Sequence, residues 1–209
     1  MTSRRALEFI GITQPVIIEA AFAIVERVGI EGLNRKILAK EVGLPLGSLE
    51  KYFKHFDELQ DELTVRALEE LVEAHRGISQ KRVGREALDA FALAERGFGL
   101  ARPKLYPVAL RPARRVEFEL DRLRGIHTNT AAAMVAGYGV PANLVREVAH
   151  CLSMALQGFI NAEINGIGIT RPEFDQSYER LLDILDAGAR SAAERACRRC
   201  ESQRFQRSR

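Results

Sequence analysis

The stretch NRKILAKEVGLPLGSLEKYF, residues 34–53, contains two short helical patterns separated by a glycine. Asn34 is a favourable N-cap residue for the first pattern, in which Leu38 and Val42 face inward. Gly43 then supplies the positive φ that a tight turn between two helices requires. The stretch therefore predicts a helix–turn–helix, with a second helix running from Pro45 to about residue 53.

The second helix of this pair has two unlike faces. Leu46, Leu49 and Phe53 fall within a sector of about 60° when successive residues are separated by about 100°. The opposite face is small, polar and basic, and consists of Gly47, Ser48 and Lys51. A core helix needs no such face, whereas a helix that enters a DNA groove does. A solvated helix pair packed into a bundle is the alternative interpretation.

Cations surround the helix pair. Arg35 and Lys36 begin its first helix, where a helix N-terminus already attracts phosphate. Lys51 and Lys54 are placed to neutralise further phosphates, and Tyr52 lies between them. Between residues 33 and 56 five cations face two anions, although the whole chain of 209 residues carries a net charge of only +3. The local concentration of positive charge therefore favours a nucleic-acid partner more than the net charge of the whole chain does.

The rest of the chain predicts an all-α fold. We expect a helix from Pro15 to Gly29, with Ile17, Ala21, Ile24 and Val28 on one face, and a long helix capped by Asp57 that buries Leu59, Leu63 and Leu71. Further helical patterns occupy 86–98, 114–137, 141–164 and 171–196, with a shorter piece after Pro103. The expected domains are a helix-turn-helix head (1–56), a larger helical body (57–200) and a basic, disordered tail (201–209).

Composition excludes several classes of protein. The sequence has no apolar run long enough to cross a membrane and no signal-peptide core, so we expect a cytoplasmic protein without a membrane partner. Three cysteines argue against a disulfide framework. Cys197 and Cys200 lack a second ligand pair, so we expect two thiols one turn apart at a helix end and neither a metal site nor a cofactor. Motifs of phosphate-binding loops, zinc proteases and serine hydrolases are missing, which predicts that the chain is not an enzyme.

Residues 17–63, IIEAAFAIVERVGIEGLNRKILAKEVGLPLGSLEKYFKHFDELQDEL, resemble the DNA-binding head of the tetracycline-repressor (TetR) family of transcription regulators. The motifs VGIEGL and LAKEVGLPLGSL, the aromatic pair Tyr52–Phe53 and Leu59 carry this resemblance. In the body, RPKLYPVAL (102–110) and MALQGFINAEINGIG (154–168) are similar to a C-terminal domain type with a His-Gly-Phe run. Gln157 occupies the histidine position of that run, and the tryptophan of the type is missing.

Two residues depart from the family pattern. The chain has Glu50 where family members usually have Tyr, and Phe56 where they usually have Lys, and the family uses both positions against phosphates. Glu50 can pair with Lys54 four residues on, or accept a hydrogen bond from a cytosine amino group. An unusual operator sequence, weakened DNA affinity and lost DNA binding all remain open.

The resemblance implies that the body dimerises and binds an effector. Two late helices carry apolar stripes suited to a four-helix dimer core or to packing within one chain: Leu152, Ala155, Leu156, Phe159, Leu181, Leu182, Leu185 and Ala189. A pocket for a small amphipathic effector is expected between 86 and 165. Its candidate lining residues, each also compatible with ordinary core or surface, are Phe91, Phe98, Leu105, Tyr106, Phe118, His127, Met134, Gln157 and Asn161.

The sequence thus predicts a ligand-responsive repressor that binds a palindromic double-stranded DNA operator as a homodimer and is released by a small-molecule effector. Residues expected at the DNA are Arg35, Lys36, Leu46, Gly47, Ser48, Lys51, Tyr52 and Lys54. The alternative is a helical ligand-binding or interaction protein whose DNA-binding head is degenerate.

Overall fold

The computed structural model describes residues 12–76, 82–112, 118–168 and 170–207, and these ranges contain helices and turns but no strand. The all-α fold class is confirmed. The chain forms two compact units, one of Met1–Glu70 with Arg102–Leu123 and one of Leu71–Ala101 with Arg124–Arg209. These units divide inside two long helices, so the domain boundaries at residues 56 and 200 stay a prediction.

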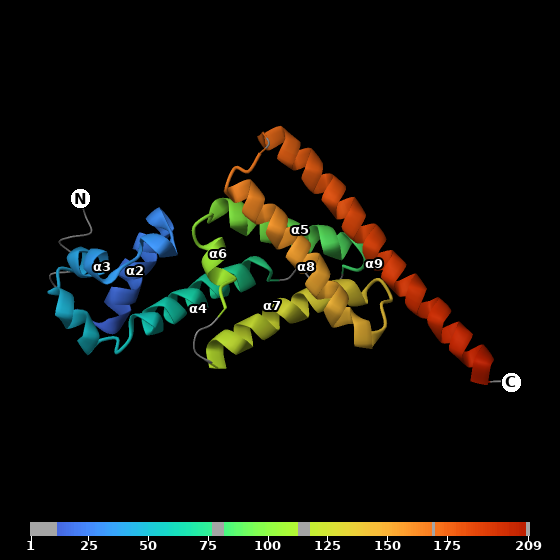
Figure 1. Ribbon diagram of the computed structural model, residues 1–209, viewed down its shortest axis with the longest axis horizontal. Helices are drawn as coiled ribbons and strands as arrows, with labels where there is room; N and C mark the ends of the chain where they lie inside the picture. Colours follow the sequence, from blue (N-terminus) through green and yellow to red (C-terminus); the bar gives the residue numbers. More distant parts are fainter. Residues whose placement is uncertain (1–11, 77–81, 113–117, 169, 208–209) are drawn as a thin grey trace. The chain divides into compact units, whose positions relative to one another are not determined.

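The first unit contains the predicted helix-turn-helix. Its elements in chain order are α2 (Gln14–Val28), η1 (Ile30–Gly32), α3 (Arg35–Val42), η2 (Leu46–Lys51), most of α4 (Phe56–Ala74), α6 (Tyr106–Ala109) and the start of α7 (Phe118–Ala136) (Figure 1). Ile17, Ala21 and Ile24 are buried as expected, but Val28 is 53% exposed. Val28 is the last residue of α2, and the chain turns away at Gly29 with φ +82°, so its side chain lies at the rim of the core.

Helix α4 agrees with its apolar pattern. Leu59, Leu63 and Leu71 are each fully buried. The helix begins at Phe56, one residue before the predicted cap, so Asp57 lies inside its first turn. An acidic side chain there still interacts favourably with the positive end of the helix dipole.

The second unit is built on three packed helices: α5 (Arg85–Ala101), α8 (Ala142–Ile164) and α9 (Arg171–Arg207), which lie against one another in Figure 1. Buried contacts include the Tyr178 hydroxyl, which donates to the Ala92 carbonyl at 2.6 Å. Beside it, Arg96 Nη2 lies 2.6 Å from Glu163 Oε1, so α5 and α8 are also joined by an ion pair. Helix α8 ends before two glycines with positive φ, Gly166 and Gly168.

Helix α9 is longer than the sequence pattern predicts. It continues to Arg207, so residues 201–207 are helical where we expected a disordered tail. The segment 189–207 contains neither glycine nor proline, and therefore nothing in its composition ends the helix. No helix within the described residues combines the length and the hydropathy that crossing a membrane would require.

Candidate nucleic-acid interface

Local sequence signals set the ends of α3 as predicted. The Asn34 side chain accepts a hydrogen bond from the Ile37 amide at 3.0 Å, which is an N-cap contact. At the other end Gly43 has φ +72°, and the Leu44 amide donates to the Ala39 carbonyl at 2.9 Å. A Cβ on Gly43 would meet nothing within 4 Å, so the positive φ, and not space, selects glycine there.

The second helix of the pair is a 3₁₀ helix, η2, instead of the predicted α-helix. The Ser48 amide donates to the Pro45 carbonyl at 2.9 Å and the Tyr52 amide to the Leu49 carbonyl at 3.0 Å, both with three-residue spacing. Leu49 and Phe53 are buried as expected. Leu46 is 54% exposed, contrary to its predicted inward place, because it begins η2 one turn before the buried Leu49.

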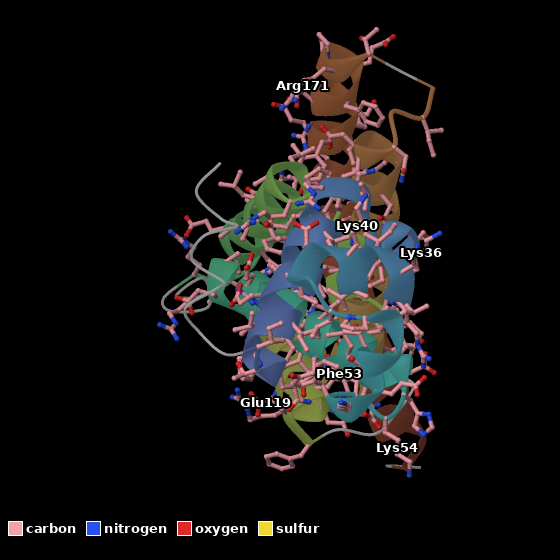
Figure 2. All side chains as sticks on the ribbon, turned by 90° about the vertical axis from the view of Figure 1, so that its left-hand side faces the viewer. Lys36, Lys40, Phe53, Lys54, Glu119 and Arg171 are labelled. Carbon is pink, nitrogen blue, oxygen red and sulfur yellow. The ribbon has the colours of Figure 1, made fainter. Side chains whose placement is uncertain are left out.

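The exposed surface of this helix pair consists mainly of small and basic residues. Leu46, Gly47 and Lys51 are exposed and Ser48 is partly buried, so the four predicted base-edge or groove residues lie along one short helix. Exposed lysines accompany them, and Figure 2 labels three, Lys36 and Lys40 on α3 and Lys54 after η2. A phosphate backbone can therefore meet positive charge from both helices of the pair.

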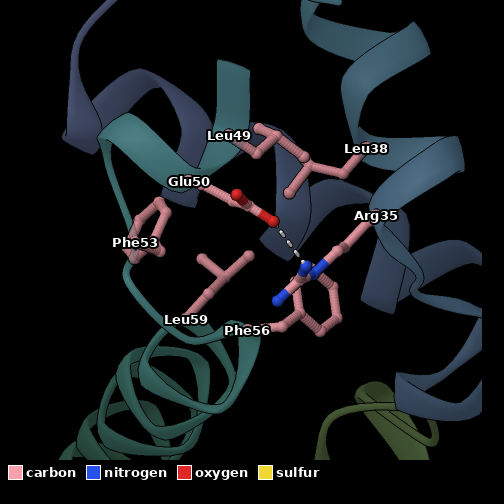
Figure 3. Close-up of a pocket in the computed structure, with 7 residues that line it drawn as sticks. All are labelled: Arg35, Leu38, Leu49, Glu50, Phe53, Phe56 and Leu59. Atoms are coloured by element: carbon pink, nitrogen blue, oxygen red, sulfur yellow. Dashed lines mark hydrogen bonds and ion pairs between the residues drawn. The ribbon is translucent and has the colours of Figure 1, made fainter. Parts of the chain in front are cut away.

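Arg35, the first residue of α3, is paired with an acidic side chain and lies beside an aromatic ring. Its Nη1 lies 3.0 Å from Glu50 Oε1, and its guanidinium carbon lies 5.9 Å from the centre of the Phe56 ring (Figure 3). Glu50 thus pairs with Arg35 and not with the predicted Lys54. The two residues that depart from the family pattern, Glu50 and Phe56, both contact the same guanidinium. They line a shallow depression whose remaining walls are Leu38, Leu49, Phe53 and Leu59.

Tyr52 joins η2 to the start of α2. Its hydroxyl donates to the Ile12 carbonyl at 3.0 Å, and Gln14 Nε2 donates to the Tyr52 carbonyl at 3.3 Å. The hydroxyl proton is therefore already used within the first unit. The phosphate contact expected from Tyr52 stays a prediction.

The candidate effector-pocket residues are divided between the two units. Leu105 and Tyr106 are buried in the first unit, whereas Phe91, Phe98 and Met134 are buried in the second. Phe118 is 84% exposed at the first position of α7, so it does not line an enclosed pocket as predicted. The remaining candidates, His127, Gln157 and Asn161, are partly buried in the second unit. The side-chain amide of Asn161 donates a hydrogen bond to the Gln157 carbonyl at 2.9 Å.

A buried polar cluster in the second unit was missed by sequence reasoning. Glu95 Oε2 lies 3.0 Å from His75 Nε2 and 3.1 Å from His127 Nε2. Burial raises the pKa of Glu95, but hydrogen bonds from the two histidines outweigh it and lower that pKa to about 2. The three residues are far apart in sequence and form no motif, so only the tertiary fold brings them together.

The predicted dimerisation residues pack inside one chain. Leu152, Leu156, Leu182, Leu185 and Ala189 are buried in the core of the second unit, and Ala155, Phe159 and Leu181 pack partly buried against it. The second alternative given by the sequence, packing within one chain, therefore describes these side chains. Among the side chains of these two helices that the structure describes, the large apolar ones that are exposed are Met154 on α8 and Ile184 on α9.

Comparisons with known proteins agree with this architecture. Residues 88–185 match the family model of the tetracyclin repressor-like C-terminal domain. An uncharacterized HTH-type transcriptional regulator, YobS of Bacillus subtilis (strain 168), is 30% identical over 101 residues, which is 48% of this chain. That match spans 53% of YobS, about half of its length.

Solved structures are similar over most of the chain. Apo ActR from Streptomyces coelicolor has a TM-score of 0.64 at 19% identity, covering 90% of this chain and 99% of ActR. A TetR variant from Acinetobacter baumannii AYE in complex with minocycline has a TM-score of 0.62 at 20% identity, covering 85% of this chain and 96% of the other. These matches support the resemblance to the TetR family of transcriptional regulators that residues 17–63 led us to expect.

Proposed function

We propose that this chain is a transcriptional repressor that binds a palindromic operator as a homodimer and releases it when a small molecule binds the second unit. One observation carries the DNA-binding part: a capped α3 and a short η2, joined by a left-handed glycine, present a small and basic surface. Two short helices with buried inner faces need no such surface for stability alone.

Different residues have different roles at the DNA in this proposal. Lys36, Lys40, Lys51 and Lys54 are exposed and supply the phosphate contacts that determine affinity. Gly47 and Ser48 face the base edges, because a residue without a side chain and one with a short hydroxyl allow η2 to approach the groove closely. Arg35 contributes less than its charge suggests while Glu50 holds it.

The proposed dimer uses the outward faces of α8 and α9. Met154 is 47% exposed and Ile184 60% exposed, although both are large and apolar. Small exposed residues accompany them: Cys151 and Gly158 on α8, and Gly188 on α9. A Cβ on either glycine would meet nothing within 4 Å in a single chain, which leaves room for the close approach of a second copy. Two such helices from each chain would form a four-helix interface.

The effector is proposed to be a small amphipathic molecule. The support is by analogy: the TetR variant was solved with minocycline, and ActR of Streptomyces coelicolor was solved with (S)-DNPA at a TM-score of 0.59 and 19% identity. Release then requires that the effector bind the DNA-free arrangement more tightly than the DNA-bound one.

Selection of bound sequences from a random DNA duplex pool tests the proposal. The full chain is used at about physiological salt with excess competitor DNA, since α9 carries several arginines that favour non-specific binding. Recovery of a palindrome with two half-sites supports a dimeric operator-binding protein. A Lys36→Glu, Lys51→Glu variant is the matched control and should recover no enriched sequence.

A second candidate function is favoured by the Arg35–Glu50 pair. If the DNA-binding head is degenerate, the chain is a helical ligand-binding or interaction protein. The double change Glu50→Tyr, Phe56→Lys restores the usual residues of the family and frees Arg35. Creation of DNA binding where the wild type has none supports this second function, whereas a modest change in an existing affinity supports the repressor.

A further inference from the structure

Three side chains of metal-ligand type converge inside the second unit from three helical segments. His75 follows the last residue of α4, Glu95 lies in α5 and His127 in α7. Their exposed side-chain fractions are 2%, 1% and 12%, so the cluster is an interior feature and not a solvated surface group. Buried groups of this kind need strong partners, since transfer of an unpaired charge out of water is costly.

The spacing of the three groups suits one shared ion. One atom, Glu95 Oε2, is 3.0 Å from His75 Nε2 and 3.1 Å from His127 Nε2, and all three ligand atoms lie within 4.8 Å of one another. Donors at the usual zinc distances of about 2.1 Å are separated by about 3.4 Å in a tetrahedral site. The two distances to Glu95 are about 0.3–0.4 Å below this value, and the two imidazole nitrogens lie within 4.8 Å of each other, so modest side-chain movements would place all three around one ion.

A hydrogen bond to a backbone carbonyl orients the ring of His75. Its Nδ1 lies 2.9 Å from the Leu71 carbonyl, and a carbonyl accepts only from a protonated ring nitrogen. Its other ring nitrogen, Nε2, is the atom that lies 3.0 Å from Glu95 Oε2 and is therefore placed to be the ligand atom. A backbone carbonyl that fixes the tautomer is also the usual outer partner of a metal-binding histidine.

The surroundings of the cluster suit a protected site. The ring of Phe91 lies 4.6 Å from the ring of His75 and 5.8 Å from the ring of His127, measured between centroids. Phe91 is itself fully buried one turn before Glu95 on α5. An apolar wall of this kind lowers the local dielectric and strengthens the attraction between a cation and the carboxylate.

We propose that His75, Glu95 and His127 form a binding site for one divalent transition-metal ion, and we expect Zn²⁺ to bind there. Two imidazole nitrogens and one carboxylate oxygen are the donor set of many three-ligand zinc sites, which leave a further position for water or another ligand. Hard cations such as Mg²⁺ prefer all-oxygen sites and are not expected to bind. This proposal does not rest on DNA binding, and the metal can be tested on the protein alone.

The test is a metal titration of the full chain after removal of metals with a chelator. Zn²⁺ is titrated against a chromogenic chelator, and Co²⁺ is added separately because its visible absorption reports coordination geometry. The background protein carries Cys151→Ser, Cys197→Ser and Cys200→Ser, since thiols also bind zinc. We expect one equivalent to bind with a dissociation constant of about 1 µM or tighter.

Variants decide whether the cluster is the site. Glu95→Gln and His127→Gln should each weaken Zn²⁺ binding by at least about 100-fold, beyond the effect typical of outer-shell changes. His150→Gln is the matched control, because it removes an exposed histidine of the same unit and should leave binding unchanged. If Glu95→Gln does not fold, X-ray absorption on the zinc-loaded background protein provides the second measurement and should show two imidazole ligands. Loss of all binding in the cysteine-free protein, or equal binding in His127→Gln, overturns the proposal.

Discussion

Arg35 Nη1 lies 3.0 Å from Glu50 Oε1, and this ion pair links the first residue of α3 to η2 across the helix-turn-helix. Phe56 lies on the other side of the same guanidinium, 5.9 Å from it. The two departures from the family pattern are therefore one structural feature. Glu50 places a carboxylate beside Arg35 and so offsets the charge of that cation within the helix-turn-helix.

We predict that Glu50→Gln strengthens DNA binding. The change keeps the shape of the side chain but removes its charge, so Arg35 becomes available to a phosphate. One additional phosphate contact should raise the slope of log K against log salt by about 1 in magnitude. Affinity for the selected duplex should rise about tenfold, as measured by fluorescence anisotropy at several salt concentrations.

Glu41→Gln is the matched control for that prediction. Glu41 is also an exposed acid of α3, and it lies 3.4 Å from Arg27 of α2. Its removal changes the net charge by the same amount without freeing a cation of the helix-turn-helix. Equal gains in affinity for both variants would mean that only net charge matters and that the Arg35–Glu50 contact has no specific effect.

Sequence reasoning succeeded where the signal was local. Asn34 and Gly43 fix the ends of α3 through contacts within five residues, so their roles were readable from spacing alone. Of the two contacts expected for Glu50, the pair with Lys54 is wrong, since (i, i+4) spacing includes Lys54 but not Arg35 fifteen residues earlier. Leu46 and Val28 were misplaced because a helical wheel gives the direction of a side chain but not where the core ends.

Tertiary contacts contain information that sequence spacing lacks. The stripe that includes Leu152 and Leu185 is equally apolar whether it faces a second chain or the interior of its own, and the structure buries it within one chain. His75 just after α4, Glu95 in α5 and His127 in α7 are brought together only by the packing of these helices. No spacing rule contains that information.

Met154→Glu together with Ile184→Glu is predicted to convert a dimer to a monomer. Both side chains are exposed and apolar, and a carboxylate at each would be desolvated in the interface without a partner. Sedimentation equilibrium should show a loss of association of at least about 100-fold. Leu93→Glu is the control, because Leu93 is 71% exposed on α5 and lies outside the proposed interface. A dimer that persists in the double variant would place the interface elsewhere.

Two glycine substitutions should change the stability of the second unit in opposite directions. A Cβ on Gly137 would lie 2.9 Å from the backbone nitrogen of Gly84 and 3.2 Å from Cα of Val83, so Gly137→Ala requires backbone movement and should cost about 1–3 kcal/mol. Gly97 lies within α5 with nothing within 4 Å of its Cβ position, so Gly97→Ala should stabilise the fold by about 0.5–1 kcal/mol. Urea unfolding followed by circular dichroism measures both, and a stabilised Gly137→Ala would contradict the close packing there.

Zinc is predicted to raise the melting temperature of the wild type through the cluster of His75, Glu95 and His127. A ligand that binds only the folded state stabilises it by about 2.7 kcal/mol at 100 times its dissociation constant. For a chain of 209 residues this corresponds to a rise of about 5–10 °C, measured by scanning calorimetry in the cysteine-free background. His150→Gln should show the full rise, whereas His127→Gln should show almost none. Because the reference for each variant is its own metal-free melting temperature, a direct effect of the substitution on folding cancels. An equal rise in His127→Gln and His150→Gln would show that zinc stabilises the chain at some other site.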